Sequence, residues 1–345
     1  MQFELSRQIV GEDQQVISLN CHFLQLYFTL YYCYICFMAT SVLCIGATLV
    51  DELYFCDVTI VPHSSNPAHK KSSIGGVMGN IAQNLATLNT TPALITAIGN
   101  DAEGSYILHE LTQKGINSAA FCITPESTGK YVSVLQPDGN LFVAVCQDNG
   151  KRYLSVAYMQ SKSDYIKGYD MLIIDTNLDT DVIQWFIHFA KQHQKMLIIE
   201  PVSVTKALQL AALDLDGVYL ITPNEAELQA ISSTSSSDTA TLVTSLLKRG
   251  VQNIWLRQGE RGSTWFSPSS TLHLAVPKIT IVDSTGAGDA ALAGWVLGKV
   301  QKDTPLNCLK LGHSLALHIL QQKGTVDVTM SATNLYDLMK TYYHD

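Results

Sequence analysis

The sequence predicts a three-layer α/β/α protein, with helices on both faces of a mostly parallel central sheet and a small β-sheet lid beside it. From residue 42 onward, short apolar runs alternate with amphipathic helical segments, which is the pattern of a parallel sheet. Residues 131–145 differ, because two strand-like runs flank a Pro-Asp-Gly-Asn turn at 137–140. We therefore expect lid strands within 51–61 and 128–146.

The composition excludes several classes of protein. Of the 345 residues, 47% are apolar and only 15% are charged, whereas disordered chains are rich in charge and poor in apolar residues. The formal net charge of −8 leaves no basic surplus to neutralise a nucleic-acid backbone, so we expect a small-molecule ligand and no nucleic-acid partner. The eight cysteines are too sparse for a disulfide framework, and we expect a cytoplasmic protein.

Residues 1–41 form an atypical apolar N-terminal extension. No Asp, Glu, Lys or Arg occurs between Asp13 and Asp51, and residues 23–39 are dense in Tyr, Phe and Cys. Three interpretations stay open: a membrane or partner anchor, an extra element packed on the domain, or an extension that does not fold independently. Membrane attachment conflicts with using residues 42–50 as the first core strand.

The predicted domain spans residues 42–345 and begins with a buried strand over 42–50 that ends at Asp51. An amphipathic helix follows over 80–88, because its apolar residues recur at helical spacing. The next apolar run, over 93–99, is the following strand. The alternation of strand and helix thus begins at the start of the domain.

The remaining strands of the predicted sheet cover residues 171–177, 196–201, 217–224 and 253–259. Each of these runs ends in polar residues or glycine. In open α/β sheets, ligands bind in the crevice at the carboxyl ends of the strands. The side chains that we expect to line this crevice are Asp51, Asn177, Glu200, Asn224 and Gln258.

The segment DSTGAGDA at 283–290 is the most informative motif, because it precedes an apolar helix. Small residues at a helix N-terminus let backbone N–H groups converge on an anion. Asp289 beside such a site suits a base that takes a proton from an attacking hydroxyl. For an isolated G-x-G, an ordinary Gly-rich turn with a capping Asp would be the better interpretation.

A second glycine-rich segment, GGVMGN at 75–80, opens the early helix. Its paired glycines allow a ligand to approach the backbone, and Asn80 offers both a donor and an acceptor. Neither glycine-rich segment contains G-x-x-x-x-G-K-[ST] or a full G-x-G-x-x-G. P-loop and dinucleotide-binding folds are therefore disfavoured.

Three motifs resemble the signatures of the ribokinase-like (PfkB-type) sugar and nucleoside kinases, and their order and spacing agree over residues 42–330. They are GGVMGNIAQNLATLN (75–89), TPNEAE (222–227) and DSTGAGDA (283–290). The last motif is highly specific, whereas the glycine pair alone is weak. Further segments resemble pseudouridine kinases more than ribokinases or fructokinases; these are TGKYVSVLQPDGNLFVAV (128–145), DTNL (175–178) and PVSVTKA (201–207).

The resemblance implies a catalytic role for the third motif. Asp289 matches the catalytic base of the family, which activates the substrate hydroxyl. Gly286, Ala287 and Gly288 match the anion hole that steadies the transferring phosphoryl group. This implication agrees with the chemistry argued from the residues themselves.

The resemblance also implies an ATP site. Asn224 and Glu227 match an N-x-x-E motif that organises Mg²⁺ and the ATP phosphates, with Glu227 acting through water. On their own, these two residues would fit a helix start with an acidic first turn. Gln258, Gly259 and Gly262 resemble the loop that lies under the nucleotide.

On the substrate side, Asp51, Gly75, Gly76 and Asn80 match positions that bind ribose hydroxyls. The flap around 130–145 matches the lid that closes over the sugar, and closure would exclude water from the transferred phosphate. Asn177 and the lid residues are candidates for reading the base. Family members often dimerise through the lid, so a homodimer through this sheet is expected as well.

Asp283 and Thr285 match ligands of the monovalent cation, such as K⁺, that many members bind. Three departures from the pattern of pseudouridine kinases affect the substrate side. Gly79 stands where many of them have Arg, Glu200 stands where Asp is usual, and residues 146–148 give the lid strand a less acidic end. The base specificity could therefore differ.

Together these features predict an ATP-dependent kinase that phosphorylates the 5′-hydroxyl of pseudouridine. The nearest alternative is a kinase of the same fold that acts on ribose, another nucleoside or a hexose. An alternative from another class is a catalytically silent ligand-binding protein that kept the fold. Intact Asp289, Asn224 and Glu227 argue against that last alternative.

Overall fold

The computed structural model describes residues 40–232, 234 and 236–344. The prediction for the apolar N-terminal extension therefore lies almost entirely outside the described residues. None of the helices in the described ranges has the length and apolar character needed to cross a membrane.

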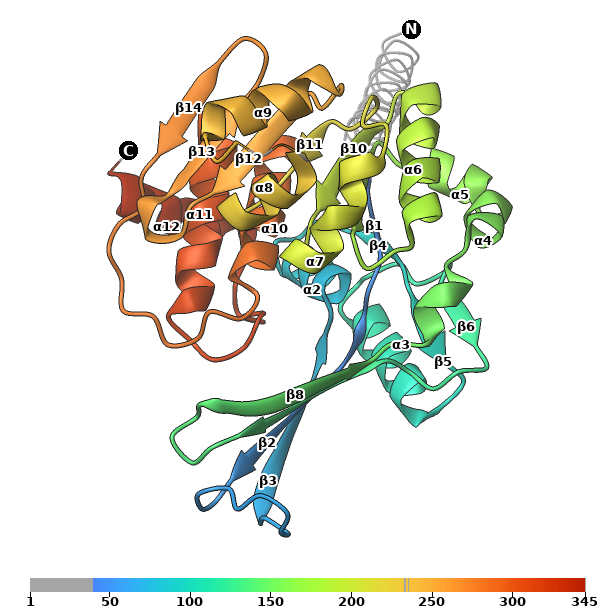
Figure 1. The fold of residues 1–345 in the computed structure, drawn as a ribbon, viewed down its shortest axis with the longest axis vertical. Coiled ribbons are helices and arrows are strands. Elements are labelled where there is room, and N and C mark those ends of the chain that lie inside the picture. Colours follow the sequence, from blue (N-terminus) through green and yellow to red (C-terminus); the bar gives the residue numbers. More distant parts are fainter. Residues whose placement is uncertain (1–39, 233, 235, 345) are drawn as a thin grey trace, which may run out of the picture. The chain divides into compact units, whose positions relative to one another are not determined.

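The central sheet has eight strands in the order β14-β13-β12-β11-β10-β9-β1-β4 (Figure 1). They are β1 (Val42–Ile45), β4 (Ala93–Ile95), β9 (Met171–Asp175), β10 (Met196–Glu200), β11 (Leu220–Ile221), β12 (Asn253–Arg257), β13 (Ser263–Phe266) and β14 (Thr271–Leu274). The strands from β4 to β12 are parallel, and β13 and β14 extend the sheet antiparallel. Short apolar runs form this sheet because helices bury both of its faces.

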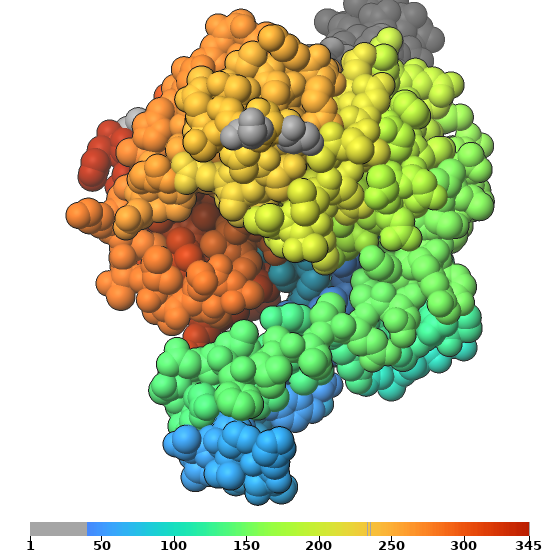
Figure 2. All heavy atoms as spheres, viewed as in Figure 1, coloured from blue at the N-terminus to red at the C-terminus, as the bar shows by residue number. Residues whose placement is uncertain are grey.

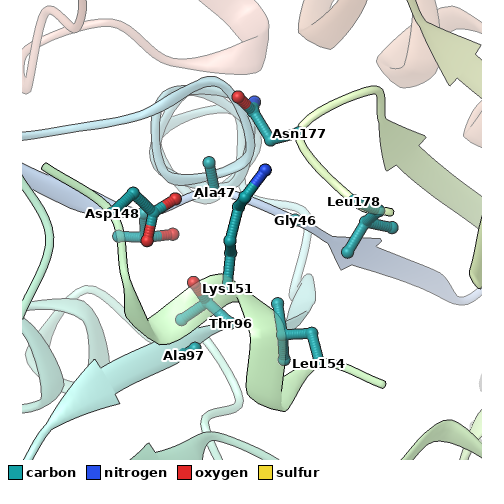
Figure 3. A pocket seen from close by; sticks show the side chains of 10 residues that line it. Gly46, Ala47, Thr96, Ala97, Asp148, Lys151, Leu154, Asn177 and Leu178 are labelled. Atoms are coloured by element: carbon teal, nitrogen blue, oxygen red, sulfur yellow. The ribbon is translucent and has the colours of Figure 1, made fainter. Parts of the chain in front are cut away.

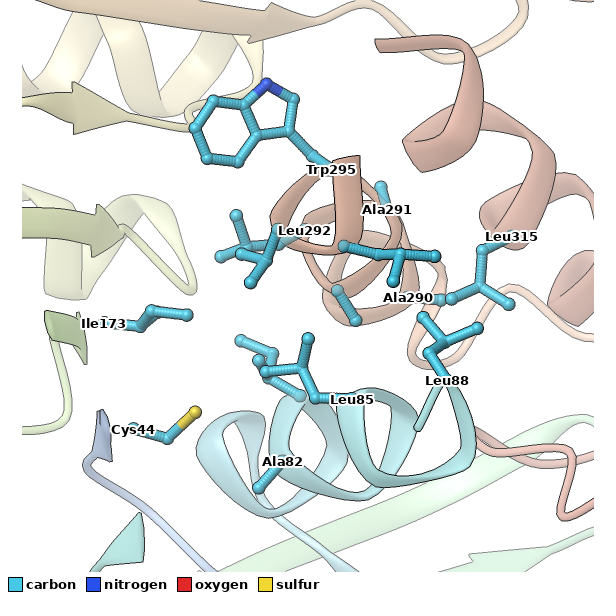
Figure 4. Packing of buried hydrophobic residues seen from close by; sticks show 14 of the residues in the cluster. Cys44, Ala82, Leu85, Leu88, Ile173, Ala290, Ala291, Leu292, Trp295 and Leu315 are labelled. Atoms are coloured by element: carbon cyan, nitrogen blue, oxygen red, sulfur yellow. The ribbon is translucent and has the colours of Figure 1, made fainter. Parts of the chain in front are cut away.

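One face of the sheet is covered by helices that share a single apolar core. These helices are α2 (Val77–Thr87), α3 (Ala102–Gln113), α10 (Ala287–Val300), α11 (Pro305–Leu320) and α12 (Ala332–Tyr343). Figure 4 shows Leu85 of α2 opposite Ala290 and Leu292 of α10, with Ile173 of the sheet beside them. This packing holds the starts of α2 and α10 next to each other, although they are far apart in the sequence.

The opposite face is covered by a second set of helices. It contains α4 (Val156–Ser161), α5 (Ser163–Lys167), α6 (Thr180–His193), α7 (Val204–Ala207), α8 (Glu225–Ser232) and α9 (Thr239–Lys248), with the short 3₁₀ segments η1 (Gly150–Tyr153) and η2 (Leu208–Ala212). Two helical layers thus enclose the sheet, which confirms the predicted three-layer α/β/α class. A third 3₁₀ segment, η3 (Gly259–Arg261), connects β12 to β13.

The lid is a separate sheet of four strands that projects from the helical layers (Figure 1). Its strands are β2 (Leu49–Cys56), β3 (Ala68–Gly75), β7 (Lys130–Leu135) and β8 (Leu141–Gln147), in the order β3-β2-β7-β8. β7 and β8 form the hairpin expected over 131–145, whereas β3 was not expected from the sequence pattern. β2 and β7 pair in parallel, so the sheet is mixed. The short strands β5 (Ala97–Gly99) and β6 (Cys122–Thr124) form a third sheet.

The single strand expected over 42–50 is wrong, because the run divides between two sheets. β1 ends at Ile45 in the central sheet, and β2 begins at Leu49 in the lid. At Gly46 the chain passes so close to Asp175 that a Cβ atom would lie 2.5 Å from the carboxylate. The next amide, of Ala47, donates to the Asp175 Oδ2 atom at 3.0 Å. The chain therefore turns out of the sheet here, and Asp51 belongs to a lid strand.

Candidate active site

The site is built around the N-terminus of α10. Gly286 caps this helix with a left-handed conformation (φ 75°, ψ 0°) and offers no side chain to the first-turn amides. A Cβ atom at Gly286 would lie 2.7 Å from the Thr325 Cβ atom, so the close approach also requires glycine. The first amides of a helix have no partner within the helix, and the helix dipole favours a negative group there. The segment can therefore bind a phosphoryl group.

Asp289 lies in the first turn of α10 and contacts the start of α2. The Asn80 Nδ2 atom donates to the Asp289 Oδ2 atom at 2.8 Å. The Asn80 Oδ1 atom accepts from the Thr325 hydroxyl at 2.9 Å, which orients the amide of Asn80. Two residues that the sequence assigned to different motifs are thus hydrogen-bonded.

The protein environment favours the protonated form of Asp289. Burial raises the pKa of this carboxyl to about 8, and the nearby carboxylates of Glu200 and Asp175 act in the same direction. The hydrogen bond from Asn80 and the charge of Arg257 oppose the rise in pKa. A carboxylate with a pKa near the working pH is well suited to accept a proton during a reaction.

A second side of the site is formed by lid residues and by the start of α2. It contains Asp51 of β2 and the glycine pair Gly75 and Gly76. A Cβ atom at Gly75 would overlap the Asp51 carboxylate, and one at Gly76 (φ 83°) would lie 2.6 Å from the Ala47 carbonyl oxygen. Both positions therefore require glycine. Burial raises the pKa of Asp51 to about 6.

A small recess adjoins this side of the site (Figure 3). It is lined by Gly46, Ala47, Thr48, Thr96, Ala97, Asp148, Lys151, Leu154, Asn177 and Leu178. The side-chain hydroxyls of Thr48 and Thr96 are buried and lack a hydrogen-bond partner in the described part of the chain. Buried polar groups are usually paired, so these two hydroxyls are free to bond a water molecule or a polar atom of a ligand in the recess.

Lysine side chains border the recess. Figure 3 shows Lys151 reaching across it toward Asn177. Lys206 of α7 donates to the Asn177 Oδ1 atom, and its charge also acts on Asp148. Asn177 was expected in the substrate site from the sequence, whereas the lysines and the two buried threonines were not. Only the position of Lys206 within PVSVTKA pointed toward this region.

Asn224 and Glu227 form a reciprocal cap at the start of α8. The Asn224 amide donates to the Glu227 Oε2 atom at 2.9 Å, and the Glu227 amide donates to the Asn224 Oδ1 atom at 2.9 Å. This capping box is the helix-start role that the sequence left open. Burial raises the pKa of Glu227. Across the described ranges, no group of three or more His, Cys, Asp or Glu side chains is placed to hold a metal ion.

The loop after β12 lies next to this cap. The Gln258 side chain donates to Glu225 at 3.3 Å and accepts from the Thr264 hydroxyl at 2.8 Å. Gly259 (φ 59°) and Gly262 (φ 87°) make the turn, and a Cβ atom at Gly262 would overlap the Leu274 carbonyl oxygen. The structure therefore brings the predicted nucleotide loop and the N-x-x-E segment together.

Asp283 and Thr285 lie in one tight turn before α10. The Asp283 Oδ1 atom accepts from the Thr285 amide at 2.9 Å, and its Oδ2 atom accepts from the Gly324 amide at 3.4 Å. Partial burial acts to raise the pKa of Asp283, but these amide hydrogen bonds outweigh it and the pKa is lowered. The carboxylate thus stays charged and ties this turn to the loop at 324.

Arg257, at the end of β12, is a charged residue of the site that sequence analysis missed. Its Nη2 atom donates to both carboxylate oxygens of Glu200, at 2.6 and 2.7 Å. Glu200 also accepts from the Thr222 hydroxyl at 2.6 Å. Glu200 was expected at the crevice, and the only signal for Arg257 was its position at the end of a predicted strand.

Comparison with known proteins gives a consistent result. The model of a family described as pfkB family carbohydrate kinase matches residues 39–332. The chain is 28% identical to pseudouridine kinase of Escherichia coli (strain K12) over 266 residues, which cover 74% of this chain and 84% of that protein. It is 25% identical to guanosine-inosine kinase of Exiguobacterium acetylicum over 277 residues, 76% of this chain and 91% of that one.

The fold also matches solved structures. The structure of Arabidopsis thaliana ribokinase complexed with ribose and ATP superposes with a TM-score of 0.77 at 20% identity, covering 88% of this chain and 99% of that chain. At this level of identity the likeness concerns the fold. It agrees with the α/β fold described above.

Proposed function

The chain belongs to the pfkB family of carbohydrate kinases, whose members transfer phosphoryl groups from ATP to hydroxyls of sugars and nucleosides, and on this premise we propose that it phosphorylates the 5′-hydroxyl of pseudouridine. The observation that carries the proposal is the hydrogen bond between Asn80 and Asp289 at the N-terminus of α10. In this proposal Asp289 is the base, and the bond holds it beside the segment that would bind the sugar and at the start of the proposed anion hole. A hydroxyl bound next to Asn80 would then face a phosphoryl group held by the amides at 286–288.

Several residues of the chain would contribute to a single phosphoryl transfer. Asp289 accepts the proton of the substrate hydroxyl as its oxygen forms a bond to the γ-phosphorus of ATP. The bond from that phosphorus to the oxygen of the departing ADP breaks. The amides at 286–288 stabilise the negative charge on the group in transfer, and they are already oriented for this before the substrate arrives.

The ATP side of the proposal uses the loop of Gln258, Gly259 and Gly262 together with Asn224 and Glu227. Mg²⁺ bound with ATP would supply charge neutralisation at the phosphates. Because the capping box engages both Asn224 and Glu227, we propose that Glu227 acts on Mg²⁺ through water. Asp283 and Thr285 remain our candidates for a K⁺ site next to the anion hole.

We infer from the groups around the recess that the substrate is a nucleoside rather than a free sugar. A uracil ring presents donors and acceptors on its edge, and the recess offers the complementary hydroxyls of Thr48 and Thr96. Lys151 and Asn177 add a charged donor and an amide. Similarity to pseudouridine kinase and guanosine-inosine kinase points in the same direction. Ribose, another nucleoside or a hexose is the alternative substrate.

A coupled ADP-release assay tests the substrate. Purified protein with ATP and Mg²⁺ is given pseudouridine, uridine, cytidine, adenosine, ribose or fructose, each with and without K⁺. Selective turnover of pseudouridine is expected. Preference for another acceptor would keep the catalytic assignment and overturn the substrate, whereas no turnover of any of the six would contradict the proposed function.

The pH dependence of kcat/KM follows from the raised pKa of Asp289. The carboxylate is the active form of the base, and it is protonated below its pKa of about 8 in the free protein. The rate is therefore expected to rise with pH and to level off above that value. A profile that is flat between pH 6 and pH 9, measured with saturating ATP, would argue against Asp289 as the base.

Thr96→Val tests the recess with a change of similar shape. The valine removes a buried hydroxyl without a partner, so the melting temperature is expected to stay the same or rise. Loss of one ligand hydrogen bond is expected to raise KM for pseudouridine by about 3- to 10-fold. KM for ribose, wherever ribose is turned over, should change little. A lower melting temperature with unchanged KM would show that the hydroxyl serves the fold.

We also propose that two copies of the chain associate through the lid. From the cysteine usage we propose a cytoplasmic location. β8 is an edge strand whose apolar side chains are strongly exposed; these are Leu141, Phe142, Val143 and Val145. Exposed apolar edge strands mark sites of association. Val143→Asp is expected to weaken dimerisation more than about tenfold, because the charge would face the partner surface. Light scattering that shows the same mass for both proteins would contradict this prediction.

A further inference from the structure

The guanidinium of Arg257 lies directly against the anion hole. A Cβ atom at Gly288 would be 2.6 Å from the Arg257 Nη1 atom and 3.6 Å from its Cζ atom. Gly288 belongs to the first turn of α10, one residue before Asp289. The absence of a side chain at 288 therefore leaves room for the guanidinium.

The two edges of this guanidinium have different surroundings. The Nη2 atom donates to both oxygens of Glu200 and to the Thr222 carbonyl oxygen. Within the described ranges, these are the side-chain hydrogen bonds of Arg257, so the Nη1 edge facing Gly288 is available to a ligand. The side chains of Arg257 and Glu200 are only 18% and 6% exposed, and this burial restricts their movement.

The charges around Arg257 explain why a cation is useful at this place. The carboxylates of Glu200, Glu227 and Asp289 all lie close enough to act on the guanidinium. Burial alone would lower the pKa of Arg257, but the Glu200 carboxylate raises it and the side chain stays charged. Without this cation, a transferring phosphoryl group would lie beside these acidic side chains with no positive side chain to offset their charge. An arginine fork can pair with a carboxylate through one edge and with a phosphoryl oxygen through the other.

We propose that Arg257 is a catalytic residue that donates through Nη1 to the phosphoryl group during transfer, and that Glu200 is a positioning residue that holds the guanidinium beneath the anion hole. The proposal concerns the transferred group and not the acceptor. It therefore does not depend on pseudouridine being the substrate.

Arg257→Met tests the contact. Loss of one preorganised donor at a developing charge lowers kcat by about 10²- to 10³-fold, and we expect a loss in this range with KM for the acceptor nearly unchanged. Arg257→Lys should retain part of kcat, because it keeps the charge but not the fork. Binding of ADP with aluminium fluoride, which mimics the phosphoryl group, should weaken in Arg257→Met, whereas binding of ADP alone should not.

Arg249→Met is the matched control. Its guanidinium is half-buried and donates to the carbonyl oxygens of Ile231, Leu210 and Leu213, on the helical layer away from α10. This variant should lose thermal stability while keeping kcat. An equal loss of kcat in Arg249→Met and Arg257→Met would overturn the proposal.

The double variant Glu200→Gln/Arg257→Met tests whether Arg257 acts on the phosphoryl group or only neutralises the charge of Glu200. If Arg257 only neutralises Glu200, removing both charges should restore kcat, because an ion pair can often be replaced as a whole. We expect the double variant to regain stability but not kcat, and guanidinium added to Arg257→Met to recover part of kcat. Restored kcat in the double variant would overturn the proposal. Failure of the wild type to phosphorylate pseudouridine would not overturn the proposal. The loss of kcat can be measured with any other acceptor that the protein phosphorylates, and the binding of ADP with aluminium fluoride needs no acceptor.

Discussion

Asp289→Asn is expected to lower kcat by about 10²- to 10⁴-fold, the range that a positioned general base contributes. The amide keeps the size of the side chain and can still accept the hydrogen bond from Asn80. It cannot take a proton from the substrate hydroxyl. The affinity for ATP should stay within about threefold, because the amides of the anion hole are unchanged. Retention of more than a tenth of kcat in Asp289→Asn would contradict the assignment.

The same variant should be more stable than the wild type at high pH. The pKa of Asp289 is about 8 in the folded protein and 3.8 in its ordinary state, so the folded form binds the extra proton between these values. Stability therefore falls as the pH rises through this range. The amide introduced by Asp289→Asn does not titrate, so the gain in melting temperature over the wild type should increase between pH 5 and pH 9. No pH-dependent difference between the two proteins would show that Asp289 titrates normally.

Gly286→Ala is expected to lower kcat by about 10²- to 10³-fold and to lower the melting temperature. The new Cβ atom would lie 2.7 Å from Thr325, whose hydroxyl orients Asn80. The left-handed conformation adds about 1 to 2 kcal/mol of backbone strain for a residue other than glycine. The anion hole and the contact between Asn80 and Asp289 would therefore both be displaced. Steady-state kinetics and thermal unfolding measure the two effects.

Gly115→Ala provides the control for backbone strain alone. Gly115 also has a left-handed conformation (φ 79°), but no atom lies within 4 Å of its added Cβ atom, and it follows α3 away from the site. It should lose a similar amount of stability to strain and keep its kcat. Equal kcat losses in Gly286→Ala and Gly115→Ala would mean that strain, and not the shape of the anion hole, causes the effect.

Short motifs made much of this site predictable from sequence. DSTGAGDA combines small residues at a helix start with a carboxylate, so local chemistry is enough to propose Asp289 as the base. Asn80 was found because paired glycines precede it, and the structure joins it to Asp289 across 209 positions. The capping box of Asn224 and Glu227 is also local, which is why its structural role could be stated beforehand.

The features that sequence analysis missed depend on distant contacts. Arg257 becomes informative only when Glu200, 57 positions away, and Gly288 lie beside it. The unpaired hydroxyls of Thr48 and Thr96 cannot be recognised without their surroundings. The break between β1 and β2 was missed because residues 42–50 are mostly apolar, and the contacts of Gly46 and Ala47 with the Asp175 carboxylate exist only in the folded chain.

The position and identity of the phosphorylated product test the central claim most directly. Wild-type protein is given ATP, Mg²⁺ and K⁺ with pseudouridine, uridine and ribose in equal amounts, and the products are analysed by mass spectrometry and ³¹P NMR. The account predicts mainly pseudouridine phosphate, with a triplet from coupling to the two protons of a 5′-methylene group. Phosphate mainly on another acceptor, or a doublet from a secondary carbon, would contradict it.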